Sequence, residues 1–194
     1  MAEIELDPEE ILIHEFEYAQ STAEQAQDDR TAILNLYLLL VGGVGSIIVG
    51  LGQSSTVSLP RSVYALIFAL LGVIGIFILF KLVRLRQAWY DSVLAMNQIK
   101  DFYLEKFPEL GKAFRWRTKS IPPLGKIWTI TFGLSLLVMI IDSVSVAVSV
   151  YFLNLRLANN DYAVSAFAAI FFFAWQMWFY FFQLRDKGSG ENRL

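Results

Sequence analysis

The sequence of 194 residues contains no cysteine and a single histidine, His14. The absence of cysteine excludes disulfide bonds, thiolate nucleophiles and cysteine-ligated metals. The single histidine also argues against a histidine-built metal site or a catalytic triad within one chain. We therefore expect no metal site, no catalytic residues and no cofactor.

Charged residues are also scarce over four long stretches of the chain. Residues 31–52, 62–80 and 162–184 carry no charge, and residues 127–155 carry only Asp142. The chain is 56% hydrophobic, with a mean hydropathy of +0.49. Because about 20 apolar residues in a helix cross a bilayer, the sequence predicts an all-α integral membrane protein with four transmembrane helices.

Two amphipathic helices are predicted to flank the first pair of spans. Asp7 is the predicted N-cap of a helix that starts at Pro8. Apolar residues recur along this helix at steps of three and four and form a first seam. A second apolar seam lies in the helix that continues beyond the second span. The first consists of Leu12, Phe16, Ala19, Ala23 and Ala26, and the second of Leu85, Trp89, Met96, Ile99 and Tyr103. Packed together, the two seams would form a cytosolic helical stalk.

The expected organisation therefore has five parts. They are a cytosolic amphipathic helix (1–30), a first transmembrane hairpin (31–80), a cytosolic helix with a basic linker (81–126), a second transmembrane hairpin (127–184) and a tail (185–194). Ten of the lysines and arginines fall in 81–126. Since positive residues favour the cytosolic side, we expect both termini in the cytoplasm and the protein in the plasma (inner) membrane.

The first span carries small and polar residues on one helical face: Asn35, Gly42, Ser46 and Gly50. Small residues at four-residue spacing let membrane helices approach closely. This face predicts helix packing, either against the second span or against another subunit.

A polar stripe runs along the third span. Thr131, Ser135, Asp142, Ser145 and Ser149 follow one another at steps of four, seven, three and four residues, which places them on one helical face. An acid inside the membrane faces a bundle interior or a water-filled cavity. Three interpretations remain open: the stripe lines an ion path between subunits, Asp142 carries protons, or Asp142 is bonded to a serine, Asn35 or Gln176 within the bundle.

The basic linker contains Arg115, Trp116 and Arg117. Tryptophan suits the headgroup level and arginines face anionic lipid, so these residues are predicted to anchor the linker at the membrane interface. The patch is too short to indicate direct binding of nucleic acid.

The order of the elements resembles SLATT domains, small bacterial membrane effectors found beside nucleotide-sensing and antiviral systems. The similarity lies in the layout of 8–30, 31–80 and 81–107, whereas the second hairpin departs from the two-span pattern. The four-span layout is also similar to accessory membrane proteins encoded in antiviral defence loci. The resemblance implies an oligomeric pore or membrane-perturbing effector of antiviral defence, activated by a cytosolic protein or signalling ligand.

The functional expectation is a homo-oligomer that conducts ions or perturbs the membrane, with the polar stripe lining the path. The alternative is a non-conducting membrane anchor or accessory subunit that recruits a cytosolic partner through its stalk. One intramembrane acid and no intramembrane histidine argue against an enzyme.

Overall fold

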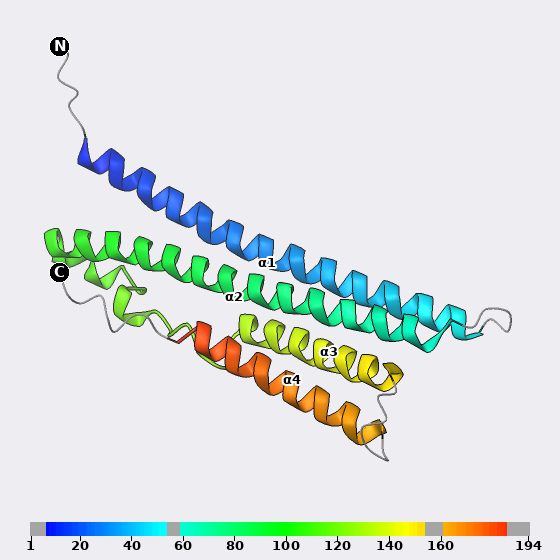
Figure 1. Ribbon diagram of the computed structural model, residues 1–194. Helices are drawn as coiled ribbons and strands as arrows, with labels where there is room; N and C mark the ends of the chain where they lie inside the picture. Colours follow the sequence, from blue (N-terminus) through cyan, green and yellow to red (C-terminus); the bar gives the residue numbers. More distant parts are fainter. Residues whose placement is uncertain (1–6, 54–58, 154–160, 186–194) are drawn as a thin grey trace, which may run out of the picture.

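A computed structural model describes residues 7–53, 59–153 and 161–185 as a bundle of long helices (Figure 1). The described residues form no strand. Four helices are long and apolar enough to cross a membrane, as the sequence predicts. They are α1 (Pro8–Gln53), α2 (Arg61–Lys106), α3 (Ile130–Leu153) and α4 (Asp161–Gln183), and the short 3-10 helices η1 (Pro108–Lys112) and η2 (Thr118–Ser120) lie between α2 and α3.

Each amphipathic helix is continuous with its neighbouring apolar run. α1 and α2 both contain 46 residues, whereas α3 and α4 contain 24 and 23. At 1.5 Å per residue the first pair is about 69 Å long and the second about 35 Å. The first two helices therefore extend well beyond α3 and α4 (Figure 1). We call this two-helix extension, residues 8–29 and 88–106, the stalk.

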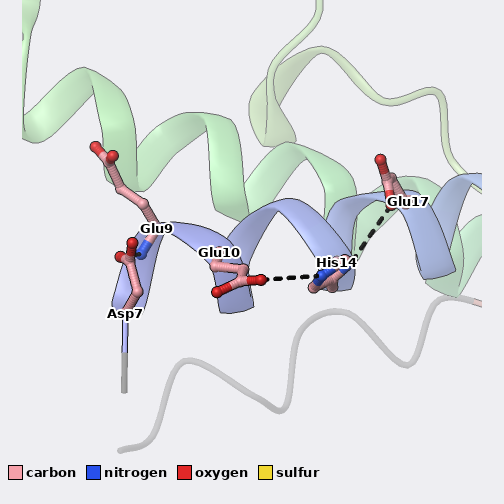
Figure 2. A network of polar contacts seen from close by, with 5 residues as sticks. All are labelled: Asp7, Glu9, Glu10, His14 and Glu17. Atoms are coloured by element: carbon pink, nitrogen blue, oxygen red, sulfur yellow. Dashed lines mark hydrogen bonds and ion pairs between the residues drawn. The ribbon is translucent and has the colours of Figure 1, made fainter. Parts of the chain in front are cut away.

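The predicted N-cap of α1 is present. The backbone N–H of Glu9 donates to Asp7 Oδ1 at 2.9 Å, which satisfies one free donor of the first turn (Figure 2). His14 lies between Glu10 and Glu17, with N···O distances of 3.9 and 3.5 Å. Glu9, Glu10, His14 and Glu17 belong to the polar, exposed start of the stalk, and Asp7 directly precedes it.

The two predicted seams meet near the tip of the stalk, where Phe16 of α1 and Ile99 and Tyr103 of α2 line one groove. Met96 of the second seam instead lines a pocket with Trp116 of the linker. Ala19, Ala23 and Ala26 are only 4–6% exposed, because their short side chains let α1 and α2 approach closely. Nearer the tip, Lys100 Nζ of α2 lies 5.6 Å from the centre of the Phe16 ring.

The third helix begins later than the expected span. Its first helical residue is Ile130, because the side chain of Thr129 caps it: Phe132 N–H donates to Thr129 Oγ1 at 3.2 Å. Trp128 immediately before it has φ 67° and is 95% exposed. A right-handed helix cannot include a residue with this left-handed backbone, so α3 can begin only after Trp128. The expected end of the span, residue 155, lies outside the described residues.

The apolar core lies where all four helices run side by side. α2 and α3 pack together at the centre, α1 packs along α2, and α4 packs along α3 (Figure 1). Side chains also connect α2 with α4, as in the Phe80–Phe179 ring contact at 4.5 Å. The buried core consists of Leu34, Tyr37, Leu79, Leu82, Val83, Val138, Met139, Tyr180 and Leu184.

The alanine seam leads to a prediction on stability. Ala23→Leu should lower the unfolding free energy by about 1–3 kcal/mol, because the larger side chain forces α1 away from α2. Thermal unfolding of the purified protein in detergent, followed by circular dichroism, measures the change. Gln25→Leu, at an exposed position two residues later, is the matched control. Equal unfolding midpoints for the two variants would contradict the close helix contact.

Candidate functional site: the buried cluster around Asp142

Asp142 lies in the middle of α3 with none of its surface exposed. Its Oδ1 accepts a hydrogen bond of 2.6 Å from the hydroxyl of Tyr37 on α1. Its Oδ2 accepts a longer bond, 3.3 Å, from the side-chain amide of Gln176 on α4. Both carboxylate oxygens therefore have donors from other helices, which is the condition for keeping an acid inside a bundle.

The remaining helix of the bundle, α2, contributes a glycine to this contact. The carboxylate of Asp142 packs directly on the backbone of Gly75 in α2, where an added Cβ would overlap the carboxylate atoms. A glycine is thus required for α2 and α3 to pack this closely at the level of the acid. We call Tyr37, Gly75, Asp142 and Gln176 the Asp142 cluster, in which all four helices meet.

The rest of the predicted polar stripe lies on the same inward face. Thr131, Ser135, Ser145 and Ser149 are all buried. Ser149 Oγ donates to the carbonyl of Ala65 at 2.8 Å and so joins α3 to the start of α2. Ser145 Oγ donates within its own helix to the Ile141 carbonyl at 2.9 Å. At the other end Thr131 Oγ1 accepts a 2.8 Å bond from Arg30 Nη1.

This burial bears on the three interpretations of the stripe. The hydrogen bond between Asp142 and Gln176 is the kind of contact that the third interpretation expects, in which Asp142 is bonded within the bundle. Asn35, another of the partners considered there, is exposed on α1. A path between several copies of the chain cannot be lined by these residues unless the bundle opens, since they face the interior of a single chain.

Tyr37 makes the shortest bond of the cluster and was not among the residues predicted for the site. The apolar seam of the stalk would have found it. Continued from Ala26 by steps of four, four and three residues, the seam passes through Arg30 and Leu34 to Tyr37. Leu34 and Tyr37 are 7% and 1% exposed, so one face of α1 is directed inward from the stalk into the apolar region.

The small-residue face of α1 points away from the bundle. Asn35, Gly42, Ser46 and Gly50 are all exposed, and an added Cβ at Gly42 or Gly50 would meet no atom within 4 Å. Ser46 Oγ donates to the Gly42 carbonyl of its own helix at 2.8 Å. This face therefore takes no part in packing between the described helices.

The predicted interface anchor is also on the surface. Arg115, Trp116 and Arg117 are exposed between η1 and η2. Arg117 Nη2 donates to the Gly111 carbonyl at 2.9 Å, and Arg115 Cζ lies 5.8 Å from the Trp116 ring centre. Trp128, which was not among the predicted anchor residues, exposes a second indole next to the start of α3.

The chemistry of the cluster is limited to one carboxylate, one phenol and one amide. Across residues 7–53, 59–153 and 161–185 there is no group of three or more histidine, aspartate or glutamate side chains that could hold a metal. The cluster can hold a proton and hydrogen-bond helices together, and it offers no nucleophile paired with a base.

No protein-family model, curated protein or solved structure matches this chain. A proposal on its function therefore rests on the geometry and the sequence of the chain itself.

The glycine in the cluster allows a sharp test of the packing. Gly75→Ala should lower the unfolding free energy by about 3 kcal/mol, because its methyl group would occupy the space of the Asp142 carboxylate. Gly133→Ala is the matched control, since a Cβ at Gly133 meets nothing within 4 Å.

Thermal unfolding in detergent again provides the measurement. The double variant Gly75→Ala with Asp142→Ser should recover part of the loss, since the shorter side chain leaves room for the methyl group. A Gly75→Ala protein as stable as Gly133→Ala would show that the four helices do not meet at Asp142 as described.

Proposed function

We propose that the protein is a homo-oligomer integral to the plasma (inner) membrane, with its stalk and both termini in the cytoplasm, and that the assembled oligomer conducts ions. In this proposal the subunits meet through the α1 face formed by Asn35, Gly42, Ser46 and Gly50. The four long apolar helices support insertion, and the lysine and arginine distribution supports the orientation.

The main support for the proposal is that α3 and α4 bury their polar side chains whereas α1 exposes some of its own. α3 and α4 turn their central polar side chains inward: Ser135, Asp142, Ser143, Ser145, Ser149, Ser165 and Gln176 are all buried. α1 instead leaves Asn35 and Ser46 exposed within its uncharged run. An amide facing hydrocarbon gains by pairing with an amide of a second chain, and the glycines let the two backbones approach.

The proposed ion path therefore differs from the one expected from the sequence. The stripe on α3 is enclosed within each chain, so a path between chains runs along α1. Its wall would carry amide and hydroxyl groups and no ring of carboxylates. The similarity in layout to SLATT domains is the only support for a role in antiviral defence, and depolarisation of the membrane is the effect that such a role requires.

A second candidate function has an observation of its own. A groove of about 420 Å³ lies on the stalk between α1, α2 and the connection that follows, lined by Leu12, Ile13, Phe16, Glu17, Gln20, Ile99, Lys100, Tyr103 and Phe114. A non-conducting accessory subunit could hold an apolar segment of a cytosolic partner there. This candidate predicts that substitutions along the groove, and not on the α1 face, remove function.

Cross-linking tests the subunit contact, because the chain has no native cysteine. Ser46→Cys should form disulfide-linked dimers when membranes are treated with a mild oxidant, since copies of α1 would be in contact. Val144→Cys is the control, because Val144 is 56% exposed on α3, away from the proposed contact. Equal cross-linking by the two variants would exclude a specific α1 interface.

A voltage-sensitive dye then tests conduction in the same cells. Wild type should depolarise the membrane, and Asn35→Leu should reduce the effect at matched protein levels while the rest of the chain stays folded. Cross-linking without depolarisation would contradict conduction and favour the accessory-subunit function.

A further inference from the structure

Two arginines lie together at one level of the bundle. Arg30 on α1 and Arg86 on α2 line the same small cavity, about 10 Å³ in volume, with Ala26, Gln27, Leu85, Trp89 and Thr131. Arg86 is only 9% exposed, which is rare for a charged side chain without a counter-ion.

Neither guanidinium has a carboxylate beside it. Within the described part of the chain, the ion pairs closer than 4.0 Å are those of His14 in the stalk. The Nε atoms of Arg30 and Arg86 are both buried without a hydrogen-bond partner. Arg30 uses one N–H on Thr131, and Arg86 Cζ lies 4.9 Å from the ring centre of Trp89. Two like charges with free donors at one cavity would be stabilised by an anion.

The position of the pair along the helices indicates the source of that anion. Arg30 directly precedes the uncharged run 31–52, and Arg86 is six residues beyond the end of the run 62–80, about 9 Å along a helix. Gln87 next to it donates to the Gln183 carbonyl at the end of α4, at 2.9 Å. This level lies just outside the hydrocarbon and within the headgroup layer of a bilayer.

We propose that Arg30 and Arg86 bind the phosphate of an anionic phospholipid from the cytosolic leaflet. The proposal rests on the membrane insertion and orientation proposed above. A cavity of this volume admits one oxygen atom, so one phosphate oxygen enters while the rest of the headgroup stays at the rim beside Gln27. Trp89 holds the Arg86 guanidinium in place, and the planar donor fork of an arginine suits phosphate oxygens.

The test uses the full chain purified in detergent micelles and three probes. These are phosphatidylglycerol, diacylglycerol with the same acyl chains, and inorganic phosphate. Each probe is titrated while the thermal unfolding midpoint is followed, which yields an apparent affinity. Arg86→Met removes the buried charge and keeps the stem, and Arg84→Met, at an exposed position of the same helix, is the matched control.

Wild type should be stabilised by phosphatidylglycerol and far less by either other probe. Arg86→Met should weaken the phosphatidylglycerol affinity by about tenfold or more, whereas Arg84→Met should stay close to wild type. If Arg86→Met fails to fold, Arg30→Met at the more exposed member of the pair takes its place.

Three results would overturn the proposal. Equal stabilisation by diacylglycerol would mean that acyl chains alone are bound. Equal stabilisation by inorganic phosphate would assign the site to a free anion. No response of wild type to any probe would mean that the cavity holds a water molecule only. Cross-linking of Ser46→Cys, measured on the same preparation carrying Arg86→Met, reports separately on the proposed assembly, so the two proposals can fail independently.

Discussion

The bundle depends on keeping one carboxylate inside an apolar region. A carboxylate in apolar surroundings must be enclosed and hydrogen-bonded, and each neighbouring helix contributes a different group to this enclosure. α1 supplies the Tyr37 hydroxyl, α4 supplies the Gln176 amide, and α2 supplies the bare backbone of Gly75. Each of these groups can contact Asp142 from only one position along its helix. The contacts therefore fix the register of helices that are otherwise covered with interchangeable leucine, valine and phenylalanine side chains.

The polar side chains of the described helices divide into a buried set and an exposed set. Polar groups of α3 and α4 are used within the bundle, down to the bond between Ser149 and Ala65. Other polar groups lie on the exposed α1 face and at the buried pair Arg30 and Arg86. These are the places where we propose a second chain and a lipid phosphate. The stalk keeps an apolar groove beside Phe16 and Tyr103. We therefore propose contacts with other molecules on α1 and α2, while α3 and α4 close the core.

Periodicity in the sequence predicted what a single helix determines by itself. The four apolar helices, the Asp7 cap, the two stalk seams and the inward direction of each seam follow from spacing along one element. Contacts that depend on the rotation of one helix against another were not accessible in this way. Nothing in the sequence distinguishes Gly75 from the other glycines of the apolar runs, and only its position opposite Asp142 makes it necessary. Arg86 looked like one base among ten in a cytosolic segment, but its place beside Arg30 and Trp89 buries it. The start of α3 was placed too early because residues 127–129 carry no charge. The helix begins only at Ile130, after the left-handed backbone of Trp128 and the cap formed by Thr129.

Water accessibility of the polar stripe tests the central claim, that the stripe is enclosed within one chain. Ser145→Cys, in a chain with no other cysteine, is treated in inside-out membrane vesicles with a membrane-impermeant thiol reagent, and Arg115→Cys is the accessible control. We predict that Ser145→Cys stays unlabelled until the protein is unfolded in detergent, while Arg115→Cys is labelled at once. Rapid labelling of Ser145→Cys in the folded protein would contradict the enclosure and place a water-filled path along α3.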